Sequence, residues 1–309
     1  MVKELLGSRW LRVGLSLALV AALVHYTDAR ELVAELRAAE PTWIAVAMVT
    51  MLASHAVCVE RWRQLAYPLG FRQSWGYFFA AYFTGMFMNL FAPSTVAGDV
   101  GRTLFLAGSG HRKSLAFTSV VAERGVGFVV LISIGALAII LQPHYDTPLP
   151  ARVVAWLIIP TFVASWYVGP RVLVRLFRRF ARVRRLLEED LAPVWNDGWL
   201  AARAVTISVA FHVLQIFVYV YVAEALGLNV PIGYFFILTP VVNILGMLPV
   251  TFSGVGIREA GMLFFLTKVG VPDQRAVAVG LIASGLTLAS GLIGGLVYAV
   301  WQSRVKARS

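Results

Sequence analysis

The sequence predicts an all-α integral membrane protein, and its composition and its long apolar stretches carry that prediction. Of its 309 residues, 59% are hydrophobic and only 14% are charged, whereas a soluble domain carries about 25% charged residues. Several apolar stretches approach the roughly 20 residues that a bilayer-spanning helix needs. The alternating pattern of about ten residues per strand that is typical of membrane barrels is absent from the sequence. We therefore expect the chain to cross a membrane as helices.

The distribution of lysine and arginine predicts about six full spans with both chain ends in the cytoplasm. Basic residues gather on cytoplasmic loops, so the net charge of +11 indicates topology and contact with anionic lipid, not nucleic-acid binding. The first span, which follows basic residues, is expected to be an uncleaved signal anchor in the bacterial inner (cytoplasmic) membrane. The expected full spans are residues 10–27, 41–60, 115–141, 151–168, 200–222 and 275–301.

Two further apolar segments are interrupted by polar, glycine-containing sequences and do not fit as simple spans. If residues 74–92 formed an ordinary span, the basic cluster at 111–113 would lie outside the cell. A hairpin that enters from the cytoplasm, turns at 93–102 and returns keeps that cluster inside. The same reasoning makes 232–268 a second re-entrant hairpin, which enters from the opposite face. The alternative is that both segments are ordinary kinked spans.

The two breaks share a pattern that indicates an internal repeat. Both read Pro-x-Thr-x-x-Gly-x-x-x-Arg, beginning at Pro93 and at Pro249, 156 positions apart. A helix, a re-entrant hairpin and a helix thus occur twice from opposite faces, which is the inverted-topology repeat of many transporters. The predicted organisation is one membrane domain over 1–309, with repeat A at about 41–141 and repeat B at about 197–301. The span 10–27, the span 151–168 and the basic cytoplasmic segment 171–190 are additions to the repeats.

Each break predicts a polar cavity, because non-helical backbone at membrane depth needs protein or water to satisfy its polar groups. After Gly98 and Gly254 we expect short helices whose N-termini face the cavity, with an arginine in the first turn of each. Helix N-termini and guanidinium groups both bind phosphate. Asn89 and Asn243, just before the breaks, are expected to accept freed backbone N–H groups. The predicted substrate-binding residues are Gly98, Gly254, Thr95, Thr251, Arg102 and Arg258.

Four more charged residues are candidates for charge coupling or ion pairs, namely Asp99, Glu123, Arg124 and Glu259. Asp99 and Glu259 either neutralise the neighbouring arginines and cap their helices, or act as proton-coupling carboxylates. Glu123 and Arg124 are adjacent and should face different directions on a helix. Glu123 either reaches Arg102 or Arg258, or forms a structural ion pair between two helices.

No motif for a metal, a cofactor or a hydrolase occurs in the sequence. His, Asp and Glu show no metal-ligand spacing, and neither a Walker sequence nor Gly-x-Ser-x-Gly is present. We therefore expect no metal site and no cofactor, and we expect neither ATP hydrolysis nor serine-hydrolase chemistry.

Three segments in this order, Met88–Leu106, Ser119–Gly127 and Leu248–Gly261, resemble the lysylphosphatidylglycerol synthase transmembrane-region family, also called the flippase-like domain family. The resemblance covers nearly the whole chain and implies an inner-membrane lipid flippase or translocase with two re-entrant elements. Bifunctional members carry a cytoplasmic aminoacyltransferase domain after this region. Because this sequence ends at Ser309, we do not expect aminoacyl transfer. The positions that match the family are Gly98, Asp99, Arg102, Glu123, Arg124, Gly254, Gly256, Arg258 and Glu259.

The leading functional hypothesis is a transporter, not an enzyme, that moves a lipid with an anionic headgroup through a cavity between the hairpins. The resemblance implies a phospholipid, a glycolipid, a polyprenyl-phosphate-linked lipid or a hopanoid as its partner, and a homo-oligomer is compatible with the sequence. One alternative is a membrane-embedded transferase on a lipid-linked substrate, which would use Asp99, Glu123 and Glu259. Another is a non-transporting accessory subunit of an envelope-lipid enzyme.

Overall fold

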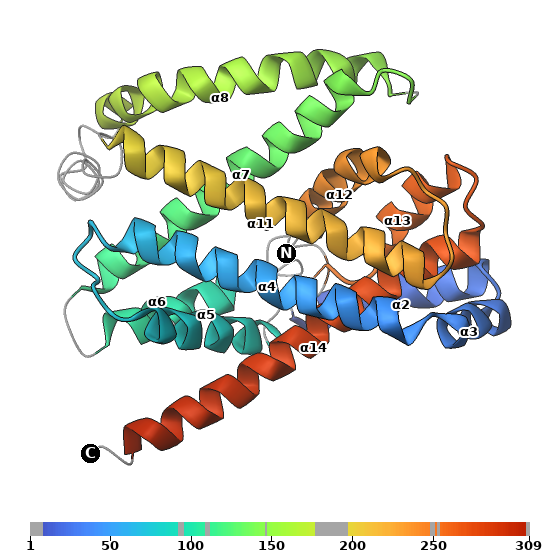
Figure 1. The fold of residues 1–309 in the computed structure, drawn as a ribbon, viewed down its shortest axis with the longest axis horizontal. Coiled ribbons are helices and arrows are strands. Elements are labelled where there is room, and N and C mark those ends of the chain that lie inside the picture. Colours follow the sequence, from blue (N-terminus) through green and yellow to red (C-terminus); the bar gives the residue numbers. More distant parts are fainter. Residues whose placement is uncertain are drawn as a thin grey trace. The chain divides into compact units, whose positions relative to one another are not determined.

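The computed structural model describes residues 9–91, 96–108, 112–145, 147–176, 197–247, 251 and 254–306, and every regular element within them is an α-helix (Figure 1). The all-α prediction is therefore confirmed for the described residues. The helices are α2 (Arg9–Tyr26), α3 (Ala29–Ala38), α4 (Pro41–Ala66), α5 (Trp75–Asn89), α6 (Val96–Ala107), α7 (Lys113–Leu141), α8 (Leu149–Leu176), α11 (Gly198–Ala225), α12 (Ile232–Met247), α13 (Ile257–Thr267) and α14 (Asp273–Lys306).

Four helices in the described part of the chain are long and apolar enough to cross a membrane. They are α4, α7, α11 and residues Asp273–Ser303 of α14, and each contains or overlaps a predicted full span. The other two predicted spans, 10–27 and 151–168, fall in α2 and α8, whose apolar stretches are shorter. The number of six spans and the re-entrant course of the two hairpins stay predictions.

The chain divides into two compact units that do not follow the order of the sequence. Unit 1 contains Met1–Ser54, Ala80–Arg102 and Val213–Ser309, and unit 2 contains His55–Phe79 and Thr103–His212. Four helices, α4, α5, α6 and α11, therefore begin in one unit and end in the other. Both glycine-containing breaks belong to unit 1.

Helices α4 and α11 run antiparallel, as contacts within unit 1 show. Trp43 near the start of α4 stacks on Tyr221 near the end of α11, with 5.7 Å between ring centroids. Further along α4, Ser54 accepts a 2.6 Å hydrogen bond from the amide of Gln215. In unit 2, α7 contacts α8. In unit 1, α13 contacts both α12 and α14.

A buried ion pair between Arg61 of α4 and Glu123 of α7 lies in the core of unit 2. The two side chains are only 3% and 2% exposed. Arg61 also donates a 2.9 Å hydrogen bond to Ser208 of α11, so its guanidinium connects three helices. A Cβ added at Gly127 would lie 3.0 Å from that guanidinium, and the Gly127 carbonyl oxygen is 2.8 Å from Nε2 of His212. A side chain at Gly127 would thus displace the arginine.

Removing one partner of this pair should destabilise the protein strongly. In Glu123→Ala the Arg61 charge would stay buried without its carboxylate, which costs about 3–5 kcal/mol in comparable sites. We expect a clear fall in the unfolding temperature of the detergent-solubilised protein, followed by circular dichroism. Glu224→Ala is the control, because Glu224 is exposed near the end of α11. Equal unfolding temperatures for the two variants would contradict a structural role for the pair.

Candidate functional site

Helices α5 and α6 form an antiparallel hairpin, and α6 contains the second part of the first break. At the open end of the hairpin, in unit 2, the hydroxyl of Tyr77 donates to the carbonyl oxygen of Phe105 at 2.7 Å. Near the break, in unit 1, a Cβ added at Gly85 would lie 2.7 Å from the carbonyl oxygen of Gly98, so the helices touch through their backbones. The N–H of Gly98 donates to Oδ1 of Asn89 at 2.7 Å, which confirms the role predicted for Asn89.

Helix α6 begins two residues before the predicted glycine, which changes the roles of two residues. Because α6 starts at Val96, Arg102 lies in its second turn, and the prediction that it lies in the first is wrong. Gly98 is a helical residue without a positive φ, so it serves the close approach to α5 and does not open the backbone. Pro93 and Thr95 lie outside the described residues.

Arg102 is neutralised within its own helix. Its side chain bonds to Oδ1 of Asp99 through Nη2 at 3.0 Å and through Nε at 3.2 Å. The guanidinium also lies 5.6 Å from the ring centroid of Tyr82, and Arg102 is only 3% exposed. Of the two roles considered for Asp99, this contact supports the neutralising one.

The second break is built on a similar hairpin, formed by α12 and α13. The hydroxyl of Tyr234 donates to the carbonyl oxygen of Phe265 at 2.8 Å, which repeats the tyrosine-to-carbonyl contact of the first hairpin. A Cβ added at Gly254 would lie 2.8 Å from the carbonyl oxygen of Gly246. Here the glycines do open the backbone, since Gly254 and Gly256 have φ of 80° and 90°, values that favour glycine. The two hairpins thus share a tyrosine-to-carbonyl contact and a close glycine contact, and the internal repeat stays a prediction.

Glu259 caps the helix that follows the second break. Its Oε2 accepts a 2.6 Å hydrogen bond from the N–H of Gly256, and its Oε1 accepts one from the hydroxyl of Ser284 on α14. The residue is fully buried. Gly280 makes room for it, because a Cβ there would lie 2.8 Å from the Glu259 Cα. Of the two roles considered for Glu259, these contacts support capping.

Arg258 differs from Arg102 because no described carboxylate neutralises it. Its Nη1 makes a long, 3.4 Å hydrogen bond to Thr287 of α14, and its buried Nε has no hydrogen-bond partner among the described residues. Oγ1 of Thr251, a residue only 2% exposed, also has no partner in that part of the chain. Pro249, the first residue of the motif, lies outside the described residues. The second break therefore holds an arginine and a hydroxyl with unused hydrogen-bonding capacity.

This difference between the two arginines was not predicted. Its cause is the spacing between each arginine and the acidic residue near it. Asp99 and Arg102 are three residues apart, so their side chains lie on the same face of α6 and can pair. Arg258 and Glu259 are adjacent on α13, and neighbours on a helix point in different directions. In the sequence the two acidic residues look equivalent, because both lie close to an arginine.

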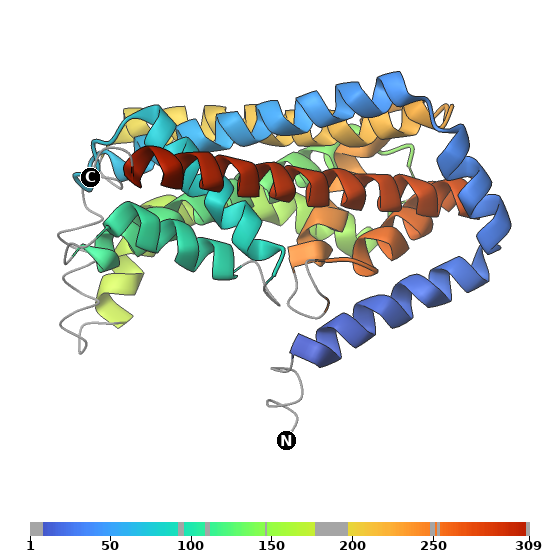
Figure 2. The same cartoon turned by 90° about the horizontal axis from the view of Figure 1, so that it is seen from below.

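Leu90, just before the first break, and Arg258 of the second break contact α14 near the middle of that helix, which Figure 2 shows as one unbroken element. Arg258 bonds to Thr287, and Leu90, at the end of the first hairpin's α5 segment, packs against Gly291, where an added Cβ would lie 2.7 Å from Cδ2 of the leucine. Four residues of α-helix rise about 6 Å, so the two contacts are about one turn apart. They lie at the centre of the apolar stretch Asp273–Ser303.

The remaining candidates lie in unit 2. Glu123 is buried and Arg124 is exposed, so the prediction that they face different directions is confirmed. Glu123 pairs with Arg61, and its contact with Arg102 or Arg258 stays a prediction. Arg61 was missed because the predicted span ends at residue 60, whereas α4 continues to Ala66. No three His, Cys, Asp or Glu side chains in the described ranges are placed to hold a metal ion.

Comparison with known proteins places this architecture among membrane proteins. The family model for the lysylphosphatidylglycerol synthase TM region matches residues 9–295. A UPF0104 membrane protein of Methanothermobacter thermautotrophicus is 24% identical over 298 residues, which cover 85% of this chain and 86% of that protein. The glycosyltransferase AglD of Haloferax volcanii is 23% identical over an alignment of 330 positions, gaps included, that covers 91% of this chain and 52% of that protein.

The family match spans nearly all of the chain, including both breaks and the helix that they share. The protein is therefore a membrane protein that belongs to the lysylphosphatidylglycerol synthase TM region family.

Proposed function

We propose that this protein translocates a lipid with an anionic, phosphate-bearing headgroup across the bacterial inner membrane. The head passes through a polar cavity between two re-entrant hairpins, while the acyl tails remain in the bilayer. Both chain ends lie in the cytoplasm. With no nucleotide-binding motif in the sequence, transport follows a gradient of the lipid or of a coupled ion. The protein acts as a transporter and not as an enzyme.

The observation that carries this proposal is that Leu90, beside the first break, and Arg258, in the second, both contact the middle of α14. The stretch Asp273–Ser303 has the length and hydropathy of a membrane span. If α14 crosses the bilayer, the contacts at Thr287 and Gly291 lie near its midplane. Interrupted helices that meet at the midplane mark the substrate site in many transporters built from inverted repeats.

The charges at the two breaks support an anionic substrate. An arginine at membrane depth is costly unless an anion or hydrogen bonds compensate it, and the half-buried Arg258 has only the long contact with Thr287 among the described residues. A headgroup phosphate would supply the missing charge-assisted hydrogen bonds, with the hydroxyl of Thr251 as a further donor. Arg102 would bind the phosphate only after leaving Asp99, so the two arginines would act in sequence.

A transferase on a lipid-linked substrate has less support. It would need a carboxylate that is available as a general base. Asp99 is engaged by Arg102, Glu123 by Arg61, and Glu259 by the N–H of Gly256 and by Ser284. The carboxylates proposed for that reaction therefore already have structural partners.

Replacing Arg258 should slow lipid movement more than replacing a surface arginine. With the protein in liposomes, we expect Arg258→Ala to reduce the translocation rate of a fluorescent anionic phospholipid by about tenfold or more. A hydrogen bond to a charged group is worth about 1.5–3 kcal/mol, and about 1.4 kcal/mol is a factor of ten. The rate is measured by chemical quenching of the outer leaflet.

Arg37→Ala is the matched control, because Arg37 is exposed on α3, and Arg258→Lys tests whether charge alone suffices. Equal rates for the natural protein and Arg258→Ala would refute the proposed site. If no tested lipid moves faster than in protein-free liposomes, the accessory-subunit alternative gains support instead.

The proposed cavity also predicts access of water to the second break. Val255 lies between the two glycines that open the backbone there, whereas Leu296 is 69% exposed on the apolar C-terminal half of α14. In Val255→Cys we expect rapid labelling by a small, charged thiol reagent in intact membranes, and in Leu296→Cys we expect little. The natural background should be low, because Cys58 is buried. Similar labelling of both variants would argue against a water-filled break.

A further inference from the structure

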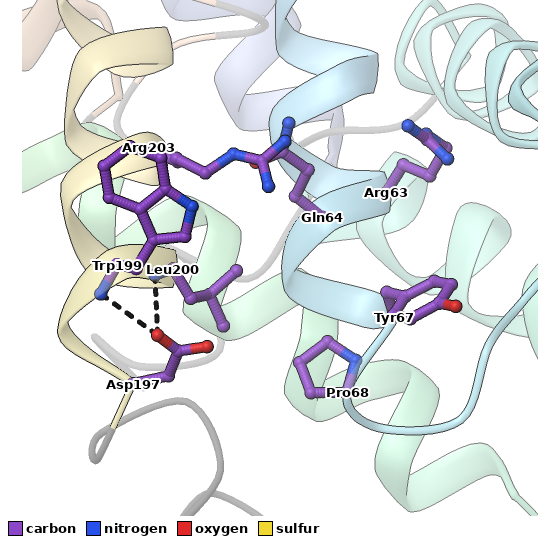
Figure 3. Close-up of a pocket in the computed structure, with 8 residues that line it drawn as sticks. All are labelled: Arg63, Gln64, Tyr67, Pro68, Asp197, Trp199, Leu200 and Arg203. Carbon is purple, nitrogen blue, oxygen red and sulfur yellow. Dashed lines mark hydrogen bonds between the residues drawn. The ribbon is translucent and has the colours of Figure 1, made fainter.

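A pocket of about 330 Å³ lies in unit 2, away from both breaks (Figure 3). Residues from the last turns of α4 and from the start of α11 line it. Neither hairpin contributes a residue to it, so the proposed translocation path does not explain it. Its volume is within the range of small-molecule sites in proteins, about 300–1,000 Å³.

Arg203 supplies the cationic group of the pocket. Figure 3 shows its side chain reaching from α11 toward Gln64 of α4. The arginine makes no salt bridge with a described residue, although Glu60 is close enough to attract its charge. Both carboxylate oxygens of Glu60 are already occupied, by Arg63 at 2.9 and 2.8 Å and by Gln64 at 2.9 Å. Arg203 therefore keeps its hydrogen-bonding capacity for an external anion.

The carboxylate of Asp197, the acidic residue in the pocket wall, is already hydrogen-bonded to the backbone. Oδ1 of Asp197 accepts hydrogen bonds from the N–H groups of Trp199 and Leu200, both at 3.0 Å, as Figure 3 shows. Asp197 thus caps the start of α11. Because the cap occupies these N–H groups, an anion in the pocket would be held by the arginine side chain and not by the helix end.

Gln64 offers a second polar group. It needs a hydrogen-bond donor from the ligand, whereas Arg203 needs an acceptor. Its amide nitrogen donates to Glu60, but its Oε1 is buried and has no hydrogen-bond partner among the described residues. An amide oxygen can only accept. A ligand that carries a hydroxyl beside its anionic group would satisfy Gln64 and Arg203 together.

The surroundings of the pocket favour a lipid over a soluble anion. The pocket lies at the ends of two helices that are long and apolar enough to cross a membrane. Trp199 and Tyr67 at its edge are 72% and 49% exposed, and such aromatic side chains gather at the headgroup level of bilayers. Arg72 adds a further cation, 4.9 Å from the ring centroid of Tyr67.

We infer that this pocket binds the headgroup of an anionic phospholipid that carries a hydroxyl group. The phosphate contacts Arg203, the hydroxyl donates to Oε1 of Gln64, and the glycerol backbone and upper acyl chains lie against Trp199. In the topology predicted from basic residues, this lipid belongs to the cytoplasmic leaflet. The site binds a resident lipid and does not depend on the protein being a translocator.

Lipid binding by the purified full-length protein tests this inference, with native mass spectrometry as the readout. The probes are phosphatidylglycerol and phosphatidylmethanol, which carry the same charge but only the first of which has headgroup hydroxyls. We expect Arg203→Ala to weaken binding of both lipids about fivefold, because one basic residue near a membrane surface contributes roughly 1 kcal/mol. Gln64→Leu should remove the preference for phosphatidylglycerol and leave phosphatidylmethanol binding unchanged.

Controls separate this pocket from general charge effects and from folding defects. Arg37→Ala removes an exposed arginine from α3 and should bind both lipids like the natural protein. Arg203→Lys keeps the charge and should retain most of the binding, which provides a readout if Arg203→Ala unfolds. Equal affinities for Arg203→Ala and Arg37→Ala, or for Arg203→Ala and Arg203→Lys, would overturn the inference. Displacement of the lipid by an equal concentration of free glycerol phosphate would overturn the assignment to a lipid.

Discussion

The first turn of a helix leaves backbone N–H groups without a partner inside the helix, and the rest of this structure depends on how that constraint is met. At the first break the side chain of Asn89 accepts the N–H of Gly98. At the second, the carboxylate of Glu259 accepts the N–H of Gly256. Because Glu259 is committed to the backbone, it does not neutralise the arginine beside it. Because of this cap, Arg258 has no carboxylate partner among the described residues.

Close packing of helices at glycine positions is the second constraint on this structure, and α14 shows it most clearly. Gly280 lies against Glu259, Gly291 against Leu90, and Gly294 beside the backbone of Phe83. Small residues are common where membrane helices pack, since van der Waals contact replaces the hydrophobic effect there. One helix therefore holds both hairpins through positions that tolerate no side chain. These contacts all fall within one compact unit.

Local sequence patterns predicted the helical class, the two breaks, the contact of Asn89 and the opposite directions of Glu123 and Arg124. Each of these follows from hydropathy, spacing or the geometry of a single helix. Arg61 and Glu123 lie on different helices, 62 positions apart in the sequence. No local periodicity can predict that they pair. The start of α6 was misplaced because the glycine of the motif was interpreted as a backbone opening, whereas Gly98 serves the approach of α5.

The two hairpins keep the same tyrosine-to-carbonyl contact, at Tyr77 and at Tyr234, but they differ in the charge left on their arginines. The position of the acidic residue relative to the arginine, three residues away in α6 and adjacent in α13, accompanies this difference. The contact that holds each hairpin together and the charge on its arginine are therefore separate properties of the two hairpins. A few substitutions near a break would therefore change the charge that the break presents while the contacts that hold its hairpin together stayed the same.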